Sequence, residues 1–217
     1  MTTLLFNLML VFLVLLLVAE AKKNIILKII AKSIASACFV SFAYLLGIHS
    51  EYDTFIFLGL VFSLLGDIFL ISTKKKIFLL GLFAFLIAHI FYVFAFLPKF
   101  QFSYFWLISL SIPLILTALF YRRIENLLGN LKIPVIIYFI VINTMLCISL
   151  SLIIQNLISI ETVLGYYIVF VGAFLFYLSD IAVAKERFIG KNFTNKLWGL
   201  PFYYIGQFFI AFSISIF

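Results

Sequence analysis

Residues 62–68, FSLLGDI, and residues 176–181, FYLSDI, are two similar stretches that each place an aspartate inside a long apolar run. A carboxylate within a membrane costs about 2.5–3.5 kcal/mol on insertion scales. The other six of the eight acidic residues fall in expected loops or at the ends of apolar runs. Because the small-residue-then-aspartate phrase occurs twice at this cost, it predicts an internal duplication that brings Asp67 and Asp180 together. Paired buried carboxylates are suited to acid–base catalysis.

The apolar runs around these aspartates continue along the whole chain. Of 217 residues, 66% are hydrophobic and only 11% are charged. An apolar run of about 20 residues spans a bilayer as one helix. The sequence therefore predicts a single all-α transmembrane domain over residues 1–217, a polytopic helix bundle of about eight spans. The expected spans are 4–19, 29–49, 54–72, 78–97, 102–121, 133–154, 162–184 and 198–217.

The basic residues predict how these spans are oriented. Of the 15 Lys and Arg residues, all but Lys99 lie in or beside the first, third, fifth and seventh connections, counting Lys32 just inside the second span. The positive-inside rule makes these connections cytoplasmic and both termini non-cytoplasmic. This placement also accounts for the net charge of +7, so no nucleic-acid partner is expected.

A second pair of similar phrases extends the duplication. Gly81 lies eight residues before His89, and Gly199 lies eight residues before Gln207. Spans three and four thus resemble spans seven and eight. An even number of helices separates the copies, so the sequence predicts a 4+4 parallel repeat, with halves of roughly 1–100 and 101–217, related by an axis along the membrane normal.

Asp67 and Asp180 are expected at the same depth. They precede the nearest cytoplasmic lysines by seven and five residues, which puts both about 7–10 Å inside the helix ends. Lys32 lies at a similar depth. It is expected either to contact a lipid phosphate or an aspartate, or to extend to the headgroups. The structural alternative for the aspartates is that they only hydrogen-bond helices together.

Further polar residues are candidates for a substrate-binding lining. These are His89 and Gln207 at matching positions of the two copies, together with Tyr92, Tyr203, Tyr204 and the mid-span Asn143. His89 is expected about 16 Å deep, and packing alone is the alternative role for it. Assigning His89 and Lys32 to the half that contains Asp67 predicts that Asp67 is ionised and that Asp180 is the protonated acid. With two histidines in the chain, we expect neither a three-histidine zinc site nor any cofactor.

Four phrases in this order resemble the YhhN or lysoplasmalogenase-like family. They are residues 65–67 (LGD), 88–92 (AHIFY), 172–180 (GAFLFYLSD) and 204–207 (YIGQ). The family often has a lysine near the start of span two followed by proline, whereas this chain has Lys32 and Ser33. The resemblance implies an integral, multi-pass protein of a bacterial inner membrane. It also implies hydrolysis of the vinyl ether bond of a lysoplasmalogen, a lysophospholipid substrate, to a fatty aldehyde and a glycerophospho-base.

Vinyl ether hydrolysis fits two carboxylates without a metal. A general acid protonates the alkene carbon, and a base assists the addition of water, as in glycoside hydrolysis. The main alternative is a small lipid or solute transporter or binding protein, although the aspartate-bearing spans lack the prolines of discontinuous transporter helices. An acyl-ester lysophospholipase would need a nucleophile, and Ser179 has no GxSxG elbow around it. The sequence does not predict an oligomeric state.

Overall fold

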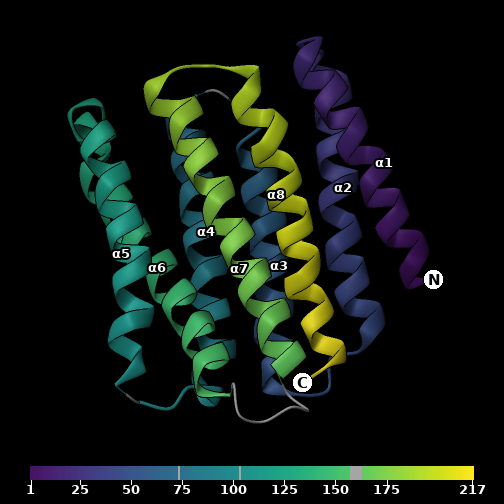
Figure 1. Cartoon of the computed structure of the whole chain (residues 1–217). Coiled ribbons are helices and arrows are strands. Elements are labelled where there is room, and N and C mark those ends of the chain that lie inside the picture. The colour runs from purple at the N-terminus through teal and green to yellow at the C-terminus, as the bar shows by residue number, and fades with distance from the viewer. Residues whose placement is uncertain (73, 103, 157–162) are drawn as a thin grey trace.

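The computed structural model describes residues 1–72, 74–102, 104–156 and 163–217 (Figure 1). Eight long helices in this part of the chain are each long and apolar enough to cross a membrane, and the same residues include no strand. The all-α, multi-pass expectation is confirmed. Residue 103 of the expected fifth span and residue 162 of the seventh lie outside the described residues. The helices are α1 (Thr2–Ala21), α2 (Ile25–Leu46), α3 (Glu51–Phe69), α4 (Lys75–Phe96), α5 (Phe105–Ile124), α6 (Lys132–Gln155), α7 (Val163–Ala184) and α8 (Phe193–Phe212).

Several helices begin earlier than the apolar runs predict, because polar caps start them. Asn24 and Asn192 precede α2 and α8, and each side chain accepts a hydrogen bond from a backbone N–H of the first turn. Ser50 and Asp53 form a capping box at the start of α3. Caps satisfy backbone groups that have no partner within the helix. Hydropathy assigns these polar residues to loops, which moved the expected starts inward.

Short helical segments flank the long helices. The 3₁₀ segments are η1 (Leu97–Lys99), η2 (Glu125–Leu127), η3 (Gly129–Leu131) and η5 (Ser213–Ser215), and η4 (Lys185–Ile189) is a π-helical turn. The η4 segment continues α7 toward α8 at the end of the bundle where residues from several helices meet around a cavity.

The packing order of the helices positions the site. Helix α3 packs on α4, and α7 packs on α8; α8 also contacts α1, α2 and α3, whereas α6 contacts both α4 and α7. At one crossing the backbones nearly touch, because a Cβ added to Gly206 would lie 2.9 Å from the carbonyl oxygen of Gly172. Small residues permit this closeness. The helix pairs α3–α4 and α7–α8 contain the repeated phrases, and the internal duplication itself stays a prediction.

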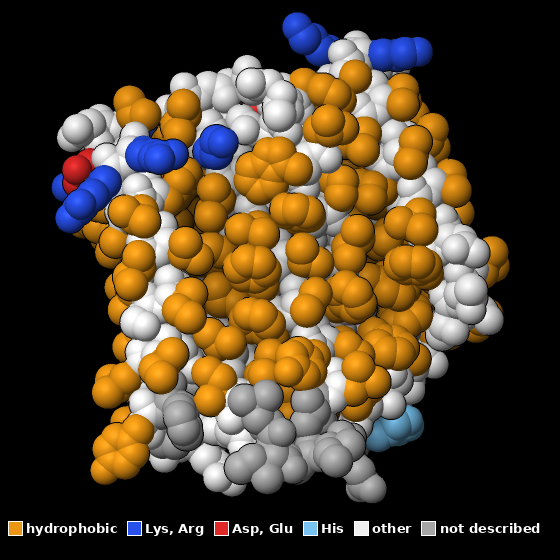
Figure 2. Space-filling model, viewed as in Figure 1, with side chains coloured by type: hydrophobic (Ala, Val, Ile, Leu, Met, Phe, Trp, Pro, Cys, Tyr) orange, Lys and Arg blue, Asp and Glu red, His pale blue; other side chains and the backbone are white. Residues whose placement is uncertain are grey.

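The charges are distributed as a membrane protein requires. Figure 2 shows Lys and Arg side chains gathered at one end and a broad hydrophobic band across the middle of this face. The α7–α8 connection lies at the basic end, and both termini lie toward the opposite end (Figure 1). The asymmetry agrees with the positive-inside pattern, and the cytoplasmic assignment of the basic end stays a prediction.

Candidate active site

Asp67 and Asp180 line one cavity of about 230 Å³. Its walls come from α1, α2, α3, α4, α7 and α8, and its lining runs from the buried Tyr203 to the exposed Lys191 at the basic end. The matched phrases therefore do bring the two carboxylates to a common cavity. Lys32 is a third charged residue of its inner wall.

Asp67 is held by three donors from two other helices. Its Oδ2 accepts hydrogen bonds from the Ser36 hydroxyl at 2.6 Å and from the Tyr203 hydroxyl at 2.7 Å. Its Oδ1 lies 3.1 Å from Nζ of Lys32. The side chain of Asp67 is 3% exposed and that of Lys32 is 10% exposed. A cation and two hydroxyl donors are the partners that suit an ionised carboxylate, so of the two expectations for Lys32 the aspartate contact is confirmed.

Asp180 has different neighbours. The Tyr138 hydroxyl on α6 donates to its Oδ2 at 2.7 Å, and Nε2 of His89 lies 3.6 Å from the same oxygen. The side chain is 12% exposed, which leaves it more open to the cavity than Asp67. The two carboxylates thus share a cavity but differ in partners: a lysine and a serine lie at one, and an imidazole at the other.

The expected grouping of His89 with Asp67 is wrong, because His89 contacts Asp180. The His89 ring packs against Phe176 of α7, with ring centroids 4.4 Å apart, and against Tyr138 of α6 at 5.3 Å. Helix α4 lies between α3 on one side and α6 on the other. Its inward face therefore turns a residue of the first half toward the aspartate of the second half.

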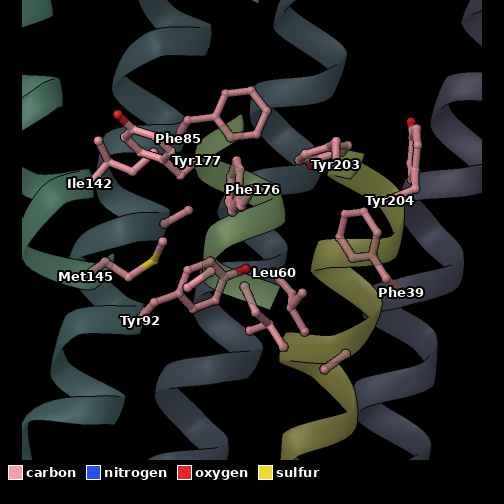
Figure 3. Close-up of a cluster of buried hydrophobic side chains, with 14 of the residues drawn as sticks. Phe39, Leu60, Phe85, Tyr92, Ile142, Met145, Phe176, Tyr177, Tyr203 and Tyr204 are labelled. Carbon is pink, nitrogen blue, oxygen red and sulfur yellow. The ribbon is translucent and has the colours of Figure 1, made fainter. Parts of the chain in front are cut away.

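Gln207 lies on the Asp67 side instead, and it is part of a buried network. The Tyr92 hydroxyl donates to Oε1 of Gln207 at 2.7 Å, and Nε2 of Gln207 donates to the Ser63 hydroxyl at 3.0 Å. In Figure 3, Phe176 lies between Phe85 and the Tyr92 hydroxyl, which points into the cluster of buried hydrophobic side chains. Neither Tyr92 nor Gln207 is among the lining residues of the cavity. These bonds join α3, α4 and α8 beneath it.

Tyr204 and Asn143 also lie outside the cavity lining. The Tyr204 hydroxyl lies 3.2 Å from the Ser36 hydroxyl, so it supports a residue that itself binds Asp67. Asn143 accepts from Thr117 at 2.9 Å and donates to the Phe139 carbonyl at 2.6 Å, within a separate cluster of α5, α6 and α7. Substrate-binding roles for these residues stay predictions.

Sequence reasoning missed two residues that touch the aspartates. Ser36 lies one helical turn after Lys32, and this i, i+4 spacing places both on one face, so the signal was present. Tyr138 is one of many aromatic residues in the apolar runs, and nothing in its own segment marks it. Only the packing of α6 on α7 brings it to Asp180.

Acidic and basic side chains form ion pairs around the mouth of the cavity. Glu20 lies 2.7 Å from Nζ of Lys28 and 2.6 Å from Nζ of Lys196, and Lys196 lies 3.4 Å from Glu186. A groove of about 640 Å³ adjoins the mouth and shares these four residues and Lys191 with it. The mouth thus offers both cationic and anionic groups near each other.

A small apolar pocket of about 40 Å³ adjoins the cavity between α4, α6 and α7. Its walls include Leu82, Val135 and Phe139, and Asp180 and Phe85 line both spaces. Asp180 therefore stands at the border between a charged cavity and an apolar pocket. Among the described residues, no group of three or more His, Cys, Asp or Glu side chains is placed to hold a metal ion.

Comparison with known proteins identifies a family and a relative of this chain. The YhhN family model matches residues 27–214. A lysoplasmalogenase homolog of Dictyostelium discoideum is 29% identical over 202 residues, covering 77% of this chain and 65% of that protein. The chain thus spans slightly less than two thirds of that relative's length. No solved structure matches this chain.

Proposed function

Because this chain belongs to the YhhN family, we propose that it is a lysoplasmalogenase-type hydrolase, which cleaves the vinyl ether bond of a lysoplasmalogen to a fatty aldehyde and a glycerophospho-base. The observation that carries the proposal is the pair of unequal aspartates on one cavity. Acid-catalysed hydrolysis needs one protonated and one ionised group, and the partners of Asp67 and Asp180 favour that division.

Asp180 is the general acid in this proposal. Its carboxyl proton passes to the alkene carbon not bonded to oxygen, and the alkene electron pair forms the new C–H bond. The carbon bonded to oxygen becomes part of an oxocarbenium ion. The contacts of Asp180 are a phenol and an imidazole, whereas Asp67 has the ammonium of Lys32 beside it. A mostly buried carboxyl group without a cationic partner favours its neutral form.

Asp67 is the ionised carboxylate. Its negative charge offsets the cationic intermediate, and it orients the water that adds to the oxocarbenium carbon. The added water gives one proton to the Asp180 carboxylate, which restores the acid. The hemiacetal then collapses: its hydroxyl proton passes to the glycerol oxygen as the C–O bond breaks, which gives aldehyde and alcohol. One water is consumed, and the protein ends in its starting protonation state. Lys32, at 3.1 Å, keeps Asp67 charged throughout.

The spaces on either side of Asp180 suit the two halves of the substrate. A phosphate matches the lysines of the mouth, and an amine headgroup matches Glu20 and Glu186 beside them. The first carbons of the alkenyl chain match the apolar pocket next to Asp180. A vinyl ether joins these two parts, so it would lie at the border where Asp180 stands. The substrate would enter from the leaflet at the basic end, which we take as cytoplasmic, with both termini on the other side.

The test is to incubate purified protein in detergent with alkenyl-, alkyl- and acyl-lysophospholipids and to identify products by mass spectrometry. Aldehyde from the alkenyl lipid alone is expected. D67N and D180N should each lower turnover by at least about 10²-fold, the lower range for a general acid or base. E51Q, an exposed carboxylate on the same helix as Asp67, is the matched control.

Two outcomes would contradict the proposal. Release of a fatty acid from the acyl lipid would indicate an esterase. Solute uptake into liposomes without any product would indicate the transporter alternative. The buried Tyr92–Gln207–Ser63 network beneath the cavity favours a cavity open at one end over a transport path.

A further inference from the structure

We propose that His89 and Asp180 hold one proton between them, and that His89 is the positioning residue that keeps this proton at the cavity. The shared proton follows from the geometry alone. Its delivery to an alkene carbon rests on the proposed function. The tests below therefore include one that needs no activity.

The first step concerns the tautomer of His89. Its Nδ1 lies 2.6 Å from the backbone carbonyl oxygen of Phe85. A carbonyl oxygen can only accept, so Nδ1 must be the nitrogen that bears hydrogen and donates. In a neutral imidazole the other nitrogen then has a lone pair and no hydrogen. The Nε2 atom of neutral His89 is thus an acceptor.

The second step concerns what Nε2 faces. His89 is 1% exposed, and its Nε2 has no hydrogen-bond partner among the described residues. The acidic atom next to it is Oδ2 of Asp180, at 3.6 Å. An ionised carboxylate is also an acceptor only. Two acceptors that face each other repel unless one of them bears a proton, and leaving the buried Nε2 atom unpaired costs about 1–3 kcal/mol.

The third step excludes other sources of that proton. The titratable groups around His89 are Tyr92 on its own helix, Tyr138 on α6 and Asp180 on α7. The Tyr92 hydroxyl donates to Gln207, and the Tyr138 hydroxyl donates to Asp180. Phe176, also of α7, packs on the ring and offers no proton. The proton therefore belongs to the His89–Asp180 pair, on either the carboxyl or the imidazole. Closing the 3.6 Å separation by roughly 0.6 Å gives an ordinary hydrogen bond.

This pair gives the acid a defined cycle. When Asp180 delivers its proton to substrate, the pair falls from one proton to none, and the Tyr138 hydroxyl still donates to the new carboxylate. The proton released by the added water restores the pair. His89 does not line the cavity, so its effect on substrate passes through Asp180.

Nuclear magnetic resonance of the imidazole nitrogens tests the pair directly. The chain has two histidines, so ¹⁵N-histidine labelling gives two sets of signals, and H49Q, which changes the exposed histidine, assigns them. We expect His89 to be protonated at Nδ1. We also expect the chemical shift of its Nε2 to change in D180N and to remain at the wild-type value in D67N. Two results would overturn the inference: a His89 ring with hydrogen on Nε2 alone, or a His89 Nε2 chemical shift that is the same in D180N as in wild type.

Kinetics supply the second readout. H89Q should lower kcat by at least about tenfold, which is part of the 10²–10⁴-fold that general acid catalysis contributes. It should leave KM within about twofold, because His89 does not line the cavity. H49Q should behave as wild type. A rise in KM with unchanged kcat would assign His89 to binding and refute the positioning role. If wild type shows no hydrolysis, the proposed function fails, while the nitrogen spectra still decide whether the proton is shared.

Discussion

Replacing Lys32 by methionine should lower the free energy of unfolding, because it removes the cation that offsets the charge of Asp67. The ammonium lies 3.1 Å from Oδ1, and the two side chains are 10% and 3% exposed. Removing one partner of a buried ion pair costs about 3–5 kcal/mol, because the other charge stays buried and uncompensated. Ser36 and Tyr203 still donate to Oδ2 in the variant, so we expect the lower end, about 3 kcal/mol.

The assay is reversible unfolding in mixed detergent, with the free energy of unfolding extracted for K32M, D67N and the double variant. K32M should be the least stable of the three. The double variant should recover most of the loss, because it leaves no unpaired charge, yet it should remain inactive because the carboxylate is absent. K28M is the control one turn away. Its ion pair with Glu20 is more exposed, and such pairs contribute at most about 1 kcal/mol. K32M as stable as K28M would refute the claim that Lys32 offsets the Asp67 charge.

Two further predictions concern the substrate chain and the topology. V135F should fill the apolar pocket of about 40 Å³ and lower turnover of alkenyl lipids relative to wild type. The control I137F, at an exposed site on the same helix, should leave turnover unchanged. Equal turnover in the two variants would show that the pocket holds no substrate. A cysteine at position 75 and one at the C-terminus should be labelled from opposite sides of intact cells. Labelling from one side would contradict the orientation.

The number of helices could be read from the sequence because a bilayer leaves little choice. A spanning segment must satisfy its own backbone groups, so each apolar run of sufficient length becomes one helix. The common cavity of Asp67 and Asp180 was predictable for a similar reason, since an expensive residue repeated in matching phrases implies matching positions. The partner of His89 was not predictable, because it depends on which face of α4 turns toward α6 and α7. Helical spacing within one segment carries no information on that choice.

The difference between the two aspartates arises from α2 and α4, and the tyrosines do not contribute to it. Each carboxylate accepts one tyrosine hydroxyl at 2.7 Å, from Tyr203 at Asp67 and from Tyr138 at Asp180. A neutral donor of the same kind at the same distance favours the ionised form of both groups equally. What remains is Lys32 and Ser36 of α2 on one side and His89 of α4 on the other. A lysine stays charged and favours an anion beside it. The His89 imidazole already donates through Nδ1, so its Nε2 can either take up a proton or accept a hydrogen bond from a protonated carboxyl group. In the proposed mechanism, two similar phrases thus supply an ionised and a protonated carboxyl group because the neighbouring helices present different partners to them.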